Sequence, residues 1–358
     1  MLEAALWLVL QVTGILWFST AVFDGLHFLL HRWRGSRWRL LRWAHGLHQV
    51  HHDFLDKRMQ VNLGLRRANI TAHILPEFAV TVICTAPFLL IFPLAAGLVL
   101  FRHCYMLVYT LWLEGVDAHH MAMSRLDGRM PAWKVTQTYH ALHHVYPNAY
   151  YSSIVKLFDV IFGTAIALPN KTVVITGTGA LARAMGNQLQ LAGCWIRYAS
   201  HDEFAYGIGP QLLLDLAHAD ILVLAHGTRA AGACQAANAD SNKALISAIT
   251  ASHATRLVPP EVWGIGSEAE LFGNDEYAVS KRAFASYAAA CFNSKALTYR
   301  HIVPGAFHSA MSPWATTAPD AVARTALFWI KRGFRYVPAT ITPLAFLNWF
   351  RFRFLAAA

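Results

Sequence analysis

The stretch HGLHQVHH at residues 45–52 determines how this chain is interpreted, because HALHHVY at residues 140–146 repeats its pattern. Both stretches contain His-x-x-His-His, and upstream of them His27 and His31 lie four residues apart. Side chains at i, i+3 and i+4 share one side of a helix, so each group is expected to direct its rings toward one point. Neutral imidazoles gathered in this way bind metal, whereas protonated rings would repel one another. The spacing therefore predicts a metal site built from His27, His31, His48, His51, His52, His140, His143 and His144.

The composition indicates a membrane protein. Of the 358 residues, 56% are hydrophobic and 14% are charged, whereas about a quarter are charged in soluble proteins. Residues 32–67 are rich in arginine and include Trp33, Trp38 and Trp43. Arginines beside tryptophans and apolar segments are typical of a cytoplasmic membrane interface. We therefore expect the net charge of +10 to serve membrane binding, and we expect no nucleic-acid partner. The five cysteines have no paired spacing, which favours a reducing compartment.

Three stretches are long and apolar enough to cross a bilayer. The first covers about residues 4–23, and two more lie between about residues 74 and 113, separated by a tight hairpin at Phe92-Pro93. One span followed by a hairpin returns every histidine group to the same membrane face, which the arginines mark as cytoplasmic. The expected fold of residues 1–168 is an α-helical, multi-pass integral membrane domain with three spans and a cytoplasmic histidine cage.

The number of histidines indicates two metal ions. Eight imidazoles exceed the roughly four to six ligands of a single ion, and they suit two ions. Imidazole binds iron, zinc and copper alike, so the ligands alone leave the metal open.

These histidine groups beside apolar hairpins resemble the membrane-bound fatty acid hydroxylase/sterol desaturase superfamily over about residues 10–166. The resemblance extends to Phe158-Asp159 and Phe162-Gly163-Thr164, which follow the last group. It implies two iron ions that use O2 to hydroxylate or desaturate a lipid, and zinc is the alternative metal in a purified sample. It also implies one further ligand from His119 or His120, of which we favour His120.

Four carboxylates near the span ends have two interpretations. They either orient imidazole N–H groups of the metal site or simply face water at the membrane surface. These residues are Asp24, Glu77, Glu114 and Asp117.

The composition changes at Leu168-Pro169-Asn170, where apolar strands begin to alternate with helical stretches. This alternation predicts a parallel α/β, Rossmann-like domain over residues 169–340. Its first strand is followed by Gly177-x-Gly179-x-x-Ala182, the context of a dinucleotide-binding turn at a helix N-terminus. Residues 341–358 combine aromatic residues with Arg351 and Arg353, and we expect an amphipathic tail that lies on the membrane.

The pair Tyr277 and Lys281 places a phenol and an ammonium group on one helix face, where the ammonium stabilises the phenolate during proton exchange. Residues 171–310 thereby resemble the short-chain dehydrogenase/reductase family. The resemblance implies that Tyr277 is the acid/base, that Lys281 also holds the nicotinamide ribose, that Ser267 polarises the carbonyl and that Asn238 has a structural role.

This second half departs from the family pattern in several places. The glycine turn is one residue shorter than usual, and residues 200–220 are too few for a complete strand–helix unit. NAD(P) is the expected cofactor. Arg197 and His201 favour NADP, Asp202 favours NAD, and the balance favours NADP slightly.

The predicted function is a membrane-bound, non-haem di-iron oxidoreductase that hydroxylates or desaturates a sterol, fatty acyl or carotenoid lipid with O2. The fused domain would interconvert the alcohol with a carbonyl compound. A hydride-transferring domain without flavin does not pass single electrons to iron, so we expect an external donor of the ferredoxin or cytochrome type. Two alternatives are a fatty-aldehyde-cleaving enzyme of wax or alkane synthesis, and a membrane scaffold with an inactive nucleotide-binding module.

Overall fold

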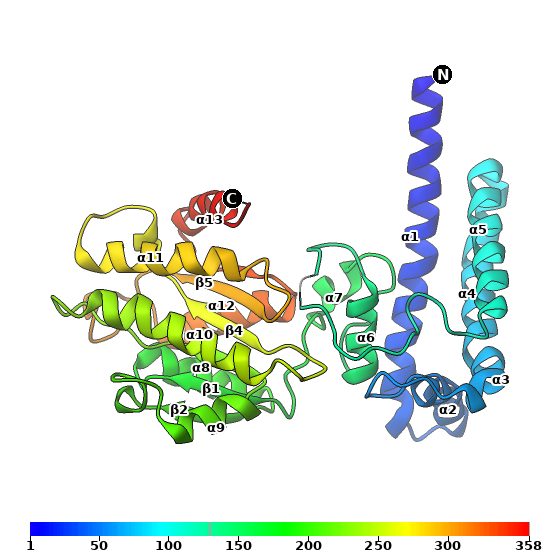
Figure 1. Ribbon diagram of the computed structural model, residues 1–358. Coiled ribbons are helices and arrows are strands. Elements are labelled where there is room, and N and C mark those ends of the chain that lie inside the picture. Colours follow the sequence, from blue (N-terminus) through cyan, green and yellow to red (C-terminus); the bar gives the residue numbers. More distant parts are fainter. Residues whose placement is uncertain (129, 358) are drawn as a thin grey trace. The chain divides into compact units, whose positions relative to one another are not determined.

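The computed structural model describes residues 1–128 and 130–357 of the chain, which forms two compact units (Figure 1). Unit 1 comprises Met1–Leu126 and Met130–Ala165, and unit 2 comprises Ile166–Ala358 with the short segment Asp127–Arg129. The division follows Ala165, close to the boundary predicted at residue 168. Ala358, the last residue of the predicted tail, lies outside the described residues.

Unit 1 is helical in its described residues. Its helices, with 3₁₀ and π-helical turns labelled η, are α1 (Leu2–Arg32), η1 (Trp33–Gly35), α2 (Arg39–Phe54), η2 (Leu63–Leu65), α3 (Arg66–Asn69), η3 (Ile70–Ile74), α4 (Leu75–Thr85), η4 (Ala86–Leu90), α5 (Pro93–Trp112), α6 (Gln137–Val145) and α7 (Leu157–Phe162).

The three predicted spans are confirmed as helices long and apolar enough to cross a membrane: Leu2–Gly35, Leu63–Leu90 and Pro93–Trp112. Pro93 occupies the first turn of α5, where its missing N–H would have no intrahelical partner. Ile15 of α1 packs against Ala95, Ala96 and Val99 of α5, and the two alanines let the helices approach closely. Large apolar side chains on the outside of α1 stay exposed, as lipid-facing residues do.

Unit 2 contains a parallel sheet between two helical layers. Its elements are β1 (Thr172–Thr176), α8 (Ala180–Leu191), β2 (Trp195–Ala199), η5 (His201–Glu203), α9 (Pro210–His218), β3 (Ile221–Leu224), η6 (Ala236–Asp240), α10 (Ser241–Ser252), β4 (Glu261–Ile265), η7 (Glu268–Glu270), α11 (Glu276–Cys291), β5 (Thr298–Pro304), α12 (Pro319–Lys331), β6 (Tyr336–Ala339) and α13 (Leu344–Ala357).

The strand order β2-β1-β3-β4-β5-β6, with every pair parallel, confirms the predicted Rossmann-like fold. One buried cluster joins the sheet to α9, α10, α11 and α13, and a second joins it to α8 and α12 (Figure 1). A doubly wound sheet carries a further strand outside β2. Here residues 200–220 form only η5 and α9, so that strand is missing, as the short stretch predicts.

A buried ion pair links β4 and β5 and should stabilise unit 2. Arg300 donates from Nε to Glu261 at 2.8 Å and from Nη2 at 3.2 Å, and both side chains are almost fully buried. Removing one partner of a buried pair leaves an uncompensated charge, at a cost of about 3–5 kcal/mol. We expect Arg300→Leu to lower the thermal unfolding midpoint of unit 2 by roughly 10 °C, measured by tryptophan fluorescence in detergent.

The matched control for this change is Arg256→Leu. Arg256 pairs with Asp220 at 3.0 Å, but its side chain is 38% exposed, so its loss should cost at most about 1 kcal/mol. Equal destabilisation by the two variants would contradict the assigned role of the Arg300–Glu261 pair.

Candidate metal centre and nucleotide site

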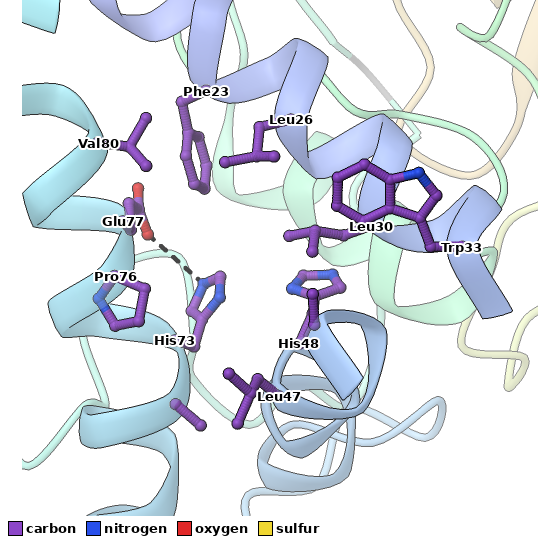
Figure 2. A pocket seen from close by; sticks show the side chains of 12 residues that line it. Phe23, Leu26, Leu30, Trp33, Leu47, His48, His73, Pro76, Glu77 and Val80 are labelled. Carbon is purple, nitrogen blue, oxygen red and sulfur yellow. Dashed lines mark ion pairs between the residues drawn. The ribbon is translucent and has the colours of Figure 1, made fainter. Parts of the chain in front are cut away.

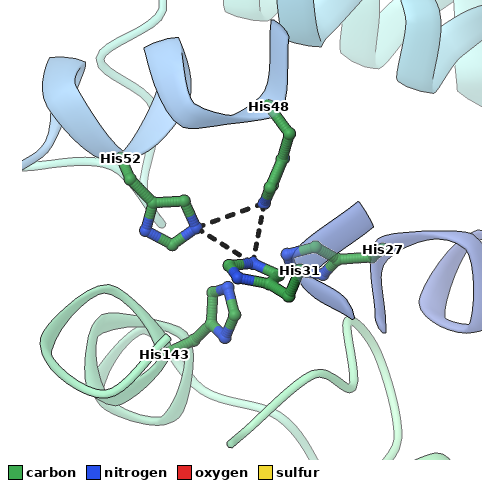
Figure 3. A group of neighbouring side chains, drawn as sticks. All are labelled: His27, His31, His48, His52 and His143. Atoms are coloured by element: carbon green, nitrogen blue, oxygen red, sulfur yellow. Dashed lines mark hydrogen bonds between the residues drawn. The ribbon is translucent and has the colours of Figure 1, made fainter. Parts of the chain in front are cut away.

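Nine histidines of unit 1 gather in two adjacent groups. Within each group, one ring nitrogen of every member lies within 4.8 Å of the corresponding nitrogen of every other member. The first group comprises His27, His31, His48, His52 and His143 (Figure 3), and the second comprises His51, His120, His140 and His144. The ring centroids of His52 and His144, one from each group, are 4.8 Å apart. All eight predicted ligands and the favoured His120 are therefore brought together.

The histidines of each His-x-x-His-His motif are divided between the two groups. This corrects the expectation that all rings of one motif are directed toward the same point. Successive residues of a helix are rotated by about 100°, so i and i+4 point in similar directions and i+3 points to the other side of i. On α2, His48 and His52 join the first group and His51 the second. On α6 the i and i+4 residues join the second group, and His143 crosses to the first.

The nitrogen atoms of the first group are spaced like ligands of one ion. The Nε2 atom of His31 lies 2.9 Å from Nε2 of His48 and 3.2 Å from Nε2 of His52 (Figure 3). Two ligands held about 2 Å from a shared metal ion are separated by about this distance. Both ring nitrogens of His27 and Nε2 of His143 are buried without a hydrogen-bond partner among the described residues, so a metal ion would satisfy them.

Hydrogen bonds from the opposite ring nitrogen orient several of these histidines. The Nδ1 atom of His143 lies 2.8 Å from the carbonyl oxygen of Ala149, and Nδ1 of His144 lies 2.8 Å from that of Leu55. A carbonyl oxygen only accepts, so Nδ1 carries the proton and Nε2 keeps its lone pair for a metal ion. The Nε2 atom of His144 is likewise buried without a partner among the described residues.

In the second group, side-chain oxygen atoms contact the Nδ1 atoms of two histidines in the same way. The Nδ1 atom of His51 lies 3.1 Å from Oδ1 of Asn69, and Nδ1 of His120 lies 2.8 Å from Oδ1 of Asp117. The Nε2 atoms of His120 and His140 are 2.9 Å apart. Asn69 could not be recognised from the sequence, because an isolated asparagine has no pattern that marks it until the fold brings it to His51.

Electrostatics keeps these rings neutral. Burial, followed by repulsion between neighbouring rings, lowers the pKa of the α2 and α6 histidines well below the usual value of 6.5; these are His48, His51, His52, His140 and His144. Burial lowers the pKa of His143 to about 4. Neutral imidazole is the form that binds metal, so the clusters are prepared for ligation at neutral pH.

Asp159 explains the motif that follows the last histidine group. Its fully buried carboxylate accepts hydrogen bonds from the Tyr139 hydroxyl at 2.8 Å and from the backbone N–H groups of Tyr151 and Ser152 at 2.9 and 2.8 Å. The Tyr151 ring then packs edge-on against His27, with ring centroids 5.6 Å apart. Asp159 therefore holds the loop that closes the first group.

The other residues considered from sequence take different places. Glu77 contacts His73 at 3.4 Å, and the His73 ring stacks on His51 with centroids 3.7 Å apart. Asp24 accepts a hydrogen bond from Ser153, and Glu114 pairs with Arg66. The remaining histidines near the site lie in neither group: His45, His103 and His119.

Replacing Asp117 by asparagine tests its role as the partner of His120. Asparagine keeps the oxygen that accepts from the His119 and His120 backbone N–H groups but loses the charge that strengthens the His120 ligand. We expect about 10- to 100-fold weaker binding of one metal ion, measured by competition with a chelator. Glu114→Gln is the matched control, because Glu114 lies at the same span end and contacts Arg66. Unchanged affinity in Asp117→Asn would refute this role.

An apolar cavity of about 200 Å³ adjoins the first group (Figure 2). Its lining comes from α1, η1, α2 and the Leu63–Leu90 helix: Phe23, Leu26, Leu30, Trp33, Ala44, Leu47, Ala72, Pro76 and Val80, with His48, His73 and Glu77 as polar members. Because His48 belongs to the first group, the cavity borders that group directly.

In unit 2 the predicted glycine turn lies between β1 and α8. Gly177 has a φ of +80°, and a β-carbon there would lie 3.1 Å from Cβ of His226, so the turn requires glycine. Gly179 is the N-cap of α8, and the space around its Cα is open. Ala182 is buried in the first turns of α8. The turn stands between β1 and β3, where the winding direction reverses and nucleotides bind in such sheets.

Asn238 and Lys281 converge behind this edge. Asn238 lies in the π-helical turn η6, where its amide donates to the Thr228 carbonyl at 2.9 Å and to Ser280 Oγ at 3.0 Å. The Lys281 ammonium donates to the Ile265 carbonyl at 2.9 Å and lies 5.8 Å from the centre of the Tyr277 ring. Tyr277 thus lies in the first turn of α11 beside a buried cation.

Ser267 has a different set of contacts. Its Oγ accepts from the Ala269 N–H, and its own N–H donates to Glu270. No hydrogen bond among the described residues joins Ser267 to Tyr277. Beneath it lies a buried network that the sequence did not suggest: Glu270 contacts His301 at 3.1 Å and accepts from Asn348 at 3.0 Å.

Arg197, which favoured NADP in the sequence, forms ion pairs within unit 2. Its guanidinium pairs with Glu203 and, at 2.9 Å, with Asp215. Two carboxylates therefore compensate its charge, and the preference for NADP stays a prediction that rests on exposed His201.

The comparisons with known proteins agree with this arrangement. Residues 12–164, the part of the chain that contains the spans and the histidine groups, match the family model for fatty acid hydroxylase. Among curated proteins, the chain is similar to a monoglucosyldiacylglycerol epimerase of Synechocystis sp., with 28% identity over 247 residues that cover 60% of each protein. Because 60% of this chain exceeds either compact unit, the similarity includes residues of both.

Two solved structures resemble unit 2. They are a short-chain dehydrogenase from Burkholderia cenocepacia in complex with NADP (15% identity, TM-score 0.41, 51% of this chain and 92% of that chain) and one from Sphingobium yanoikuyae in complex with NADPH (14%, 0.40, 51% and 92%). The strand order of unit 2, and not these likenesses, defines its fold.

Proposed function

We propose that the protein is a membrane-bound di-iron enzyme that uses O2 to hydroxylate or desaturate a lipid, and that unit 2 interconverts the resulting alcohol with a carbonyl compound using NAD(P). The observation that supports this proposal most strongly is a pair of buried histidine groups next to an apolar cavity, in a unit whose helices are long and apolar enough to cross a membrane. The arginines near residues 32–67 support a cytoplasmic location for the histidine groups and for unit 2.

The residues of unit 1 would bind the metal ions and position the lipid beside them. An iron pair bound by the two histidine groups would supply the reduction of O2 and the oxidation of a C–H bond. The cavity wall binds the lipid chain and excludes water, and His73 with Glu77 borders the path to the metal centre. Hydroxylation consumes the lipid, O2, two electrons and two protons and yields a lipid alcohol and water.

In unit 2, the Tyr277 hydroxyl would exchange a proton with the substrate oxygen while hydride moves to or from the nicotinamide. Lys281 lies close enough to stabilise the phenolate. Because hydride carries two electrons together, we propose a separate ferredoxin- or cytochrome-type donor for unit 1. Lipid oxidation supported by NADPH alone would overturn that part of the proposal.

Product analysis tests the main reaction. The full-length protein would be loaded with ferrous iron in lipid nanodiscs and supplied with isotopically labelled O2, reduced ferredoxin and a total lipid extract. We expect labelled lipid alcohols or lipids that have lost two hydrogens. A shortened hydrocarbon would instead support aldehyde cleavage, and unchanged lipids without O2 uptake across several donors would refute O2-dependent oxidation.

The similarity to an epimerase favours a second candidate reaction at unit 2. A hydride-transferring site can invert an alcohol centre of a glycolipid by oxidising it to a ketone and returning hydride to the opposite face. Incubation of the protein with monoglucosyldiacylglycerol and NAD(P) in the absence of O2 would detect this reaction as a new glycolipid epimer. An epimer formed without O2 favours this candidate over lipid oxidation.

A further inference from the structure

Exposed apolar side chains surround the edge of unit 2 that carries Tyr277. All six strands are parallel, so the loops that follow β4, β5 and β6 meet at one edge of the sheet. These loops present Phe272 after β4, Met311 and Trp314 after β5 and Ile341 after β6, with Trp314 70% and Ile341 fully exposed. We name these four residues the apolar rim. Tyr277 lies in the first turn of α11, at the same edge.

The helix that follows the rim is apolar on two sides. Its inner side is fixed to unit 2 by Ala345, whose carbonyl accepts from the Tyr336 hydroxyl at 2.7 Å, by the Asn348–Glu270 hydrogen bond and by fully buried Phe352. Its outer side exposes a further set of large apolar residues: Phe346, Leu347, Trp349, Phe350 and Phe354. The inner contacts are enough to hold α13, so its outer side is available to a partner.

The partner that fits this surface is a lipid bilayer. The same chain carries three helices suited to crossing a membrane, so unit 2 is tethered where lipid is abundant. The outer side of α13 combines a tryptophan with phenylalanines and a leucine, while Arg351 donates to the Glu270 carbonyl and Arg353 lies 5.7 Å from the centre of the Phe292 ring, so both arginines contact unit 2. Tryptophan beside large apolar residues is enriched where proteins meet the lipid–water interface.

We propose that the apolar rim and the outer side of α13 form a membrane-docking surface, through which Tyr277 receives a lipid alcohol or ketone directly from the bilayer. The proposal rests on the proposed function for the nature of the substrate. Docking itself needs no turnover, so it can be tested separately from the chemistry. A substrate that kept its apolar part in the bilayer would need to expose only its reacting carbon to reach this edge.

Photochemical labelling by lipid tests the docking surface. The full-length protein would be placed in nanodiscs of phosphatidylcholine and phosphatidylglycerol that contain a phospholipid with a diazirine on its acyl chain. After illumination, mass spectrometry should find lipid adducts in peptides covering 306–317 and 341–354 as well as in the three spans. Peptides with Leu191 and Trp195, which are exposed at the opposite edge of the sheet, are the internal control. Adducts confined to the spans would overturn the proposal.

A substitution separates docking from folding. Phe350→Ser with Phe354→Ser changes outer residues of α13 only, and Leu191→Ser is the matched control. We expect several-fold fewer adducts at the rim and a raised KM for a lipid ketone, with an unchanged kcat/KM for a water-soluble ketone. Unchanged labelling refutes docking by α13. Normal labelling without any ketone reduction would leave docking intact and would contradict the proposed function of unit 2.

Discussion

Replacing His143 by alanine is expected to remove metal from the first histidine group and to abolish lipid oxidation. His143 is completely buried, and the Ala149 carbonyl fixes its Nδ1 proton so that Nε2 faces His27 and His31. Replacing a residue that orients a metal ligand lowers metal affinity or activity by about 10- to 100-fold. Loss of the ligand itself should therefore reduce product formation by at least about 100-fold. Metal analysis by mass spectrometry should show the loss of one ion per chain.

His45→Ala is the matched control for this change. His45 belongs to the same helix as three of the grouped histidines, but its ring contacts the Leu30 carbonyl at 3.0 Å and it joins neither group. Its replacement should leave metal content and lipid oxidation unchanged. A His143→Ala protein that keeps its full complement of metal would contradict the ligand assignment.

Replacing Tyr277 by phenylalanine should separate the two halves of the reaction. Removal of the proton-transferring hydroxyl is expected to slow NAD(P)-dependent ketone reduction by about 10²- to 10⁴-fold. Metal content and O2-dependent lipid oxidation should stay at the level of the unchanged protein, since Tyr277 belongs to unit 2 and the histidines belong to unit 1. Steady-state rates of cofactor oxidation give the measurement.

Tyr287→Phe provides the comparison, because Tyr287 lies on the same helix and packs against the apolar core of unit 2. A Tyr277→Phe protein as active as this control would exclude Tyr277 as the acid/base. A loss of lipid oxidation together with ketone reduction would indicate that the two reactions are not independent.

The fold was largely predictable because its signals are local. Long apolar stretches, the break at Phe92-Pro93 and the alternation of strands with helices after residue 170 each depend on neighbours in sequence. The shortness of residues 200–220 was also visible in the sequence; the structure shows that this stretch keeps the helix α9 and lacks the additional strand.

The division of the histidines was less accessible to sequence reasoning. Spacing identified the rings that share a helix, but which ring turns to which ion depends on how α1, α2 and α6 pack. The partners that orient the rings come from distant residues or from backbone carbonyls, as with Asn69, Leu55 and Ala149. A carbonyl oxygen has no sequence signature, so only the three-dimensional arrangement reveals it.

The same limit applies to charge in unit 2. Arg197 lies on the strand where a residue can recognise the 2′-phosphate of NADP, yet Glu203 and Asp215 already compensate it. Both partners follow in sequence, but their distance from Arg197 depends on the turn at η5 and on the packing of α9.

Anaerobic titration of the metal-free, full-length protein with ferrous iron tests the central claim most directly. Two histidine groups, each with buried nitrogen atoms oriented toward its centre, predict that two ions bind tightly to each chain. The second group should lose its ion first in the Asp117→Asn protein. Binding of one ion or none per chain, with all nine histidines present, would contradict a two-metal centre.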